Sequence, residues 1–269
     1  MIYFAKRFHV KSTHALIIVA LLFAGFAQAG QLPPQKEYYS ILVYHLKDAA
    51  QETRLDVYLK DALLPALHKA GIAKAGVFKP IDNDTSADRR VYVFIPGRSA
   101  EQLLKLPDQL LTNSSYVSAG KDYIDAAWDQ PVYTRMETII LEAFPGMTKM
   151  EVPVLKSAKS ERVYELRSYE SASEKLHRNK VDMFNKGDEI GLFKKLGFNA
   201  VFYADVLSGS HMPNLMYMTT FENRASREEH WKAFSSDPVW KALLPQPQYA
   251  HNTSHSDVIL LHPADYSDF

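Results

Sequence analysis

Hydrophobic and polar positions divide residues 161–263 into six predicted elements. Ser171 and Ser226 are each followed three residues later by a glutamate, the spacing of a capping box at a helix start. Asp237, directly before a proline, predicts one further helix start. Strands are predicted from apolar alternation at 163–169, 198–207, 215–221 and 258–262. The predicted order is therefore strand, helix, strand, strand, helix, strand.

Residues 37–145 show the same order. The first helix, which runs through Ala70, carries an apolar stripe with a spacing near 3.6, and Ser99 precedes the second helix. The stripe consists of Leu55, Leu59, Ala62, Leu63, Ala66 and Ala70. Strands are predicted at 38–45, 75–80, 90–95 and 138–144.

The two halves align with each other as an internal repeat. An offset of 126 residues places 56–60 on 182–186, and an offset of 125 places 39–44 on 164–169. Self-similarity at a fixed offset indicates a duplicated unit. Residues 146–160, rich in Lys, Ser and Pro, are interpreted as the linker between the halves.

The first helix of each half contains a residue that weakens a helix interior. Pro65 interrupts the N-terminal helix, and the aligned residue in the second half is Gly191. We predict a kink or a break at both positions.

Two βαββαβ units predict an α+β fold of tandem ferredoxin-like units. In this arrangement helices cover one face of each sheet and leave the other face bare. A bare apolar face needs a partner, and the second copy supplies it. We therefore expect the two sheets to pack face to face as a barrel-like core within one chain.

The N-terminal 29 residues have the pattern of a signal peptide. Basic residues precede the apolar run 15–26, and Ala27 and Ala29 flank one residue as in a small-x-small cleavage site. Twelve apolar residues make a helix of about 18 Å, too short for a hydrocarbon core of about 30 Å. The predicted product is a periplasmic or secreted bacterial protein, cleaved near Ala29, with no membrane span in the mature chain.

Charge and composition exclude several classes of protein. The full chain balances 31 basic against 31 acidic residues, and removal of residues 1–29 leaves 28 against 31. Without a basic block we predict no nucleic-acid partner. The absence of cysteine excludes disulfides, thiolate catalysis and iron–sulfur clusters.

The C-terminal half resembles a known family. The segment Trp231-Lys-Ala-Phe-Ser-Ser-Asp-Pro-Val-Trp240 is the most specific motif, supported by residues 162–170 and by Asn214-Leu-Met-Tyr-Met218. Over residues 162–262 the chain resembles the NIPSNAP family of the dimeric α/β-barrel superfamily. The resemblance implies the dimeric α/β-barrel fold, with both halves of the barrel supplied by one chain. It implies no settled reaction.

Histidines give no metal or haem prediction. His251 and His255 have the spacing of two ligands on one helix face, but the residues between them form helices poorly. His177 lies in a basic stretch that is interpreted as solvated helix surface, and His211 and His230 lie in a turn and on a helix. Nucleotide, zincin and hydrolase motifs are absent from the sequence. We predict no metal and no cofactor.

The candidate site lies on the first strand of the C-terminal half. Alternation places Glu165, Arg167 and Tyr169 on one face, which we expect to point into the barrel because Leu166 should face the helices. Tyr44 is the aligned residue of the other half. An Arg at such a site could hold a small anionic ligand, whereas a simple Glu165–Arg167 ion pair would be only structural.

Two classes of function remain. We predict an exported, non-catalytic module that binds a small anionic molecule or a protein partner; the oligomeric state is left open. The alternative is a cofactor-poor or haem-handling enzyme of the monooxygenase or isomerase type. The enzyme should show a sizeable cavity containing a His or carboxylate with a shifted pKa, whereas a binding protein needs only an apolar or aromatic patch.

Overall fold

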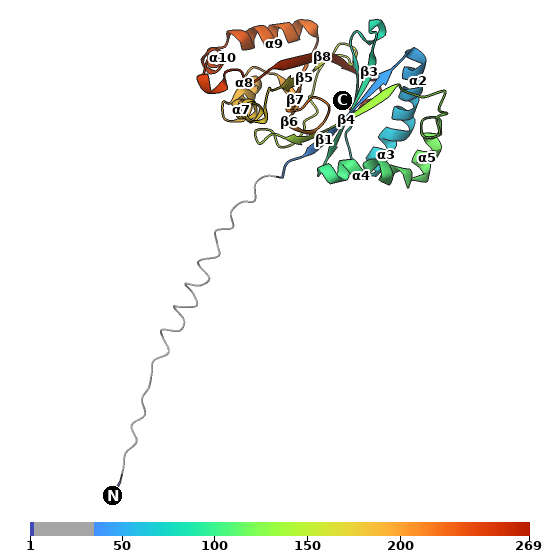
Figure 1. Ribbon diagram of the computed structural model, residues 1–269, viewed down its shortest axis with the longest axis horizontal. Helices are drawn as coiled ribbons and strands as arrows, with labels where there is room; N and C mark the ends of the chain where they lie inside the picture. The colour runs from blue at the N-terminus through green and yellow to red at the C-terminus, as the bar shows by residue number, and fades with distance from the viewer. Residues whose placement is uncertain (3–34) are drawn as a thin grey trace. The chain divides into compact units, whose positions relative to one another are not determined.

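The computed structural model describes residues 1–2 and 35–269, and residues 36–269 form one compact unit (Figure 1). The predicted signal peptide therefore lies outside the described residues, apart from its first two. Within the described part of the chain, no helix has the length and apolar character needed to cross a membrane.

The N-terminal half follows the predicted order with additional short helices. It consists of β1 (Tyr38–Leu46), α2 (Ala49–Tyr58), the π-helical η1 (Leu59–Leu63), α3 (Leu64–Lys69), β2 (Gly76–Pro80), the 3-10 helix η2 (Asn83–Thr85), β3 (Arg89–Gly97), α4 (Ala100–Leu111), α5 (Ser114–Ala119), α6 (Lys121–Ile124) and β4 (Arg135–Ala143). Ser99 caps α4 as predicted, since its side chain accepts a hydrogen bond from Gln102 N–H.

The C-terminal half repeats the plan. It consists of β5 (Val163–Glu170), α7 (Glu174–Asn185), α8 (Glu189–Lys195), β6 (Asn199–Ser208), β7 (Asn214–Phe221), α9 (Arg224–Ser236), α10 (Pro238–Leu243), the 3-10 helix η3 (Pro247–Tyr249) and β8 (His255–Pro263). Asp237 caps α10 as predicted. The other two caps were assigned wrongly: Ser173 caps α7 and Asn223 caps α9.

The eight strands close into one barrel in the order β1-β3-β2-β8-β5-β7-β6-β4. Each half contributes four antiparallel strands in the ferredoxin-like order, β4-β1-β3-β2 and β8-β5-β7-β6. Pairing of β2 with β8 and of β4 with β6 joins the halves. The prediction of an intrachain dimeric α/β barrel is confirmed, and the edge pairing goes further than face-to-face packing because it removes the free sheet edges.

The barrel interior is filled by apolar side chains from both halves. Phe94 stacks on Phe202 with 5.0 Å between ring centroids, and Phe78 packs on Tyr164 at 4.9 Å. The C-terminal Phe269 joins this cluster and is 2% exposed. Helices α2–α5 and α7–α10 lie on opposite sides of the strands (Figure 1). Each helix layer thus covers the outer face of its own sheet.

The first helix of each half is interrupted, near the predicted position at Pro65 but not at Gly191. In the N-terminal half the π-helical turn η1 ends directly before α3, where Pro65 occupies the first turn. In the C-terminal half the break falls at residues 186–188, ahead of Gly191, which lies inside α8. Asp188 adopts a left-handed conformation (φ 60°) at this break. The prediction of a break at Gly191 was wrong, because the chain leaves the helix at residues 186–188 and Gly191 is helical.

Candidate functional site

Strand β5 faces the opposite way from the prediction. Tyr164 and Leu166 point into the barrel and belong to its apolar cluster, whereas Tyr169 packs in the cluster beneath α7–α10. Glu165 and Arg167 share the helix-facing side by alternation, and their partners lie on α9. The prediction was wrong because both sheets fill the interior of a closed eight-stranded barrel. Apolar residues such as Leu166 therefore face the barrel interior rather than the helices.

Glu165 is a fully buried carboxylate with several donors around it. Arg167 Nε lies 2.6 Å from Oε1, and Arg227 donates from Nε (2.8 Å) and Nη2 (3.0 Å). Trp231 Nε1 donates to Oε2 at 2.7 Å. The predicted Glu165–Arg167 ion pair is therefore present, as part of a larger network. These contacts offset the cost of removing a carboxylate at 0% exposure from water.

Arg167 is held in a fixed orientation by its neighbours. Its guanidinium carbon lies 3.8 Å from the centre of the Trp231 ring, a cation–π contact. Nη1 donates to the Tyr169 hydroxyl at 3.0 Å, and that hydroxyl lies 2.9 Å from the hydroxyl of Tyr217. Arg227, the other arginine bound to Glu165, also donates from Nη1 to Glu228 at 2.7 Å.

A cavity of about 490 Å³ lies over this network. It is formed on the outer side of the C-terminal sheet, beside Arg167 and away from the apolar cluster that fills the barrel. Arg167 and Lys180 contribute cations and Glu189 an anion. The aromatic part of the wall comes from Tyr169, Trp231, Phe234, Trp240 and Tyr249. Its volume is within the usual range for small-molecule sites.

Lys180 and Glu189 form a second buried ion pair in the cavity wall. Lys180 Nζ lies 3.2 Å from Glu189 Oε2, and the two side chains are 7% and 4% exposed. Burial raises the pKa of Glu189, and the charge and hydrogen bond of Lys180 act in the opposite direction. A carboxylate with a raised pKa in a cavity is a candidate for proton transfer.

Sequence reasoning missed this second pair. Lys180 belongs to the basic stretch interpreted as surface, and Glu189 begins α8 after the helix break. The break turns α8 back toward α7 and brings the two side chains together. The i, i+3 spacing of Lys180, Met183 and Phe184 with the buried His177 was a signal that this face of α7 is inward.

Tyr44 does not join Arg167. It faces the N-terminal helices, and its hydroxyl lies 3.2 Å from that of Tyr123. A separate cavity of about 350 Å³ lies here, with an apolar lining completed by tyrosines such as Tyr58 and Tyr116. The structure therefore brings Glu165, Arg167 and Tyr169 together and places Tyr44 in the equivalent cavity of the other half.

The histidines also depart from expectation. His177 was assigned wrongly to the surface: it is buried, and its Nε2 lies 2.6 Å from Asp205 Oδ1. His251 and His255 do not share a helix, since His251 has φ 56° in a turn and His255 begins β8. His230 Nδ1 lies 2.6 Å from the backbone oxygen of Ser226.

Comparison with known proteins agrees with this architecture. Residues 164–268 match the NIPSNAP family model. The C-terminal half is a NIPSNAP domain. The match covers β5 to the C-terminus and so includes Glu165, Arg167, Lys180 and Glu189. No curated protein matches the sequence significantly.

Two solved structures share the fold over most of the chain. A "putative monooxygenase" from Fusobacterium nucleatum superposes with a TM-score of 0.57 at 7% identity, over 86% of this chain and 93% of that one. A second protein of the same description, from Lactobacillus acidophilus, gives a TM-score of 0.50 at 13% identity, over 85% and 94%. At these identities the similarity shows a shared fold, which spans the NIPSNAP domain and the N-terminal half.

Proposed function

We propose that this protein is exported and that its NIPSNAP domain binds a small anionic organic molecule in the cavity beside Arg167. One observation supports this most directly: a guanidinium fixed by Trp231 and Tyr169 lines a cavity of about 490 Å³. A pre-oriented Arg is well suited to a carboxylate or phosphate, which it can bind through two parallel hydrogen bonds.

Charge and shape narrow the class of ligand. Of the Lys, Arg, Asp and Glu residues that line the cavity, Arg167 and Lys180 are cations and Glu189 is an anion. The remaining wall is largely aromatic and apolar. A ligand with one anionic group and an apolar or aromatic body would satisfy both features.

The export part of the proposal rests on the sequence. A basic segment, an apolar run and Ala27 and Ala29 precede the barrel. The absence of cysteine is compatible with a bacterial periplasm, where disulfides are permitted but not required.

Titration of the cavity with 1-naphthoate, and with neutral 1-naphthol, tests the binding function. Quenching of tryptophan fluorescence reports binding, because Trp231 and Trp240 line the cavity. Arg167→Gln should weaken naphthoate binding by about 10- to 100-fold, the value of a charge-assisted hydrogen bond, and leave naphthol binding unchanged. Arg98→Gln, at an exposed position of the other half, is the matched control. Equal naphthoate affinity of Arg167→Gln and the parent would contradict the proposal.

Native mass spectrometry of protein purified from periplasm asks which ligand is carried. A co-purified anion lost in Arg167→Gln and retained in Arg98→Gln would identify the class directly. A bound chromophore such as haem would instead favour the enzyme alternative.

Glu189 favours a second function: proton transfer by an enzyme that uses no cofactor. The cavity contains a carboxylate whose pKa burial raises, which is the feature expected of an enzyme. The role of Glu189 would be to accept a proton from a ligand carbon and return it, as in an isomerase. The monooxygenase description of the two structural neighbours concerns those proteins and reaches this chain only through the fold.

Incubation of the co-purified ligand with the protein in D2O separates binding from proton transfer. Deuterium should enter the ligand with the parent protein and not with Glu189→Gln, while both bind it. If the parent incorporates as little deuterium as Glu189→Gln, the proton-transfer function is excluded and only the binding function remains.

A further inference from the structure

One end of the barrel interior is polar, unlike the rest. Ser168 and Asn214 are both buried there and hydrogen bond to each other, with Asn214 Nδ2 2.8 Å from Ser168 Oγ. Beyond them on the same inward faces come Glu170 at the end of β5 and His255 and Asp257 at the start of β8. The apolar filling therefore stops before this end, and chemically active side chains take its place.

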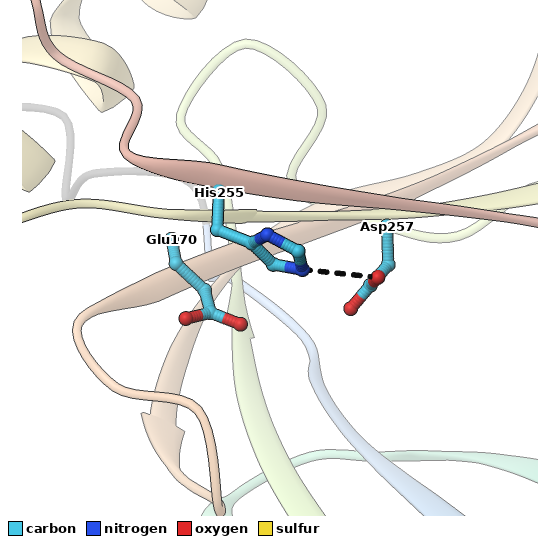
Figure 2. A group of neighbouring side chains, drawn as sticks. All are labelled: Glu170, His255 and Asp257. Carbon is cyan, nitrogen blue, oxygen red and sulfur yellow. Dashed lines mark hydrogen bonds and ion pairs between the residues drawn. The ribbon is translucent and has the colours of Figure 1, made fainter.

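Strand pairing fixes how these three side chains meet. Glu170 lies directly opposite His255 in the β5–β8 register, and Asp257 lies opposite Ser168, two residues further along β8. All three consequently point to one side of the sheet, with the His255 ring between the two carboxylates (Figure 2). One ligand atom from each lies within 4.8 Å of the others, and His255 Nε2 is 3.2 Å from Asp257 Oδ1.

We propose that Glu170, His255 and Asp257 bind one divalent transition-metal ion at this end of the barrel. Two carboxylates supply the two negative charges, and an imidazole favours a Zn²⁺-like ion over Mg²⁺ or Ca²⁺. A bound ion would hold the three ligand atoms at distances of about 2.0–2.2 Å. In residues 35–269 this is the one group of three or more such side chains with this spacing.

The carboxylate of Glu170 is not fully satisfied by hydrogen bonds. Its Oε1 is buried without a hydrogen-bond partner, a situation that costs free energy. His211, from the β6–β7 loop, places Nδ1 3.0 Å from this oxygen without hydrogen-bond geometry. With His211 beside Oε1, the carboxylate has capacity left for a metal ion, and His211 would act as a positioning residue for it.

The surroundings leave room for a further ligand. A small cavity of about 120 Å³, enough for water, borders Asp257 and His211. Arg90 also lines it, but its charge is already paired with Asp88, at 2.6 Å. Three protein ligands with an adjacent water-sized space resemble an open coordination site rather than a closed structural one.

From the sequence we expected no metal, because His255 was weighed only as a partner of His251 on one helix face. The signal that was available is the His-x-Asp alternation on one face of a strand. Its partner Glu170 is 85 residues away and could be paired with it only through the sheet register.

Isothermal titration of the full mature protein with Zn²⁺, and the visible spectrum of added Co²⁺, test the site. We expect one ion per chain and a Co²⁺ spectrum that changes on mutation of the ligands. His255→Gln and Asp257→Asn should each weaken Zn²⁺ binding at least tenfold. His68→Gln is the matched control, because His68 is also exposed and also contacts one carboxylate, Asp268 at 2.8 Å.

His255 and Asp257 are largely exposed, so their variants should keep the circular dichroism spectrum and melting temperature of the parent without metal. In that case the melting temperature rises with Zn²⁺ for the parent and for His68→Gln but not for His255→Gln. Binding that His255→Gln leaves unchanged, or substantially less than one ion per chain in the parent, would overturn the proposal.

Discussion

The two halves share one backbone plan but present different chemistry to the space between sheet and helices. The C-terminal cavity of about 490 Å³ is bordered by Arg167, Lys180 and Glu189, whereas the N-terminal cavity of about 350 Å³ has an apolar and tyrosine lining. The equivalent strand positions are Ser40, Leu42 and Tyr44 in β1 against Glu165, Arg167 and Tyr169 in β5.

This difference shows which surfaces of a duplicated barrel can diverge. The barrel interior is filled by both halves together, so a polar change on either side disturbs a shared core. The helix-facing side of each sheet belongs to one half alone. Charges could therefore accumulate in one cavity while the other stayed apolar.

The largest expected effect is at Glu165, compared with its counterpart Ser40. Glu165→Gln removes the negative charge that Arg167 and Arg227 both contact, so the free energy of unfolding should fall by about 3–5 kcal/mol. Ser40→Ala should change it by less than about 1 kcal/mol. Urea denaturation of both variants measures the contrast. Similar losses of unfolding free energy at both positions would mean that the charged network of the C-terminal half is no more important for stability than the uncharged N-terminal counterpart.

Trp231 provides the next contrast. It packs edge-on against Phe198 at 4.9 Å, stacks with Arg167 and donates to Glu165, so Trp231→Ala should cost about 3 kcal/mol, the lower end for a half-buried tryptophan. The aligned residue of α4 is the exposed Lys105, whose ion pair with Glu101 is worth less than about 0.5 kcal/mol. Thermal melts of Trp231→Ala and Lys105→Ala should differ accordingly, and an unchanged melt for Trp231→Ala would refute the packing role.

Glu189 should make the stability of the C-terminal half depend on pH in a way that the N-terminal half does not. Its pKa is raised above the ordinary 4.5 by burial, so the native state binds more protons than the unfolded state between these two values. Stability contributed by this group therefore falls as pH rises through that window. The aligned Leu63 cannot titrate. Urea denaturation at several pH values above 4.5 should show the parent losing stability relative to Glu189→Gln; parallel curves would exclude the effect.

The smallest expected effect separates the two tyrosines. Tyr169→Phe removes the acceptor of Arg167 Nη1 and should weaken 1-naphthoate binding several-fold, because the guanidinium is then less firmly oriented. Tyr44→Phe removes only a contact with Tyr123, so it should leave naphthoate binding unchanged. Fluorescence titration of the pair tests this, and a loss of binding in Tyr44→Phe would show that the two halves cooperate.

The sequence by itself determined the repeated βαββαβ order and the interruption of the first N-terminal helix near Pro65. These follow from local physics: alternation, helical spacing, and the cost of Pro65 within a helix. Helix caps were predictable where the N-cap residue is unambiguous, at Ser99 and Asp237, but not where a neighbour such as Ser173 or Asn223 was available. The ion pair of Glu165 with Arg167 was predictable because the two residues are two apart on one strand.

Only the tertiary structure decided which side of β5 faces the ligand space. Alternation separates Leu166 from Arg167, but both faces of a ferredoxin-like sheet are covered in a closed barrel, so the pattern alone cannot say which cover each face meets. In the same way, Lys180 with Glu189 and Glu170 with His255 are separated along the chain and become neighbours through a helix break and a strand register. Local sequence thus specified the elements, and long-range packing specified the sites.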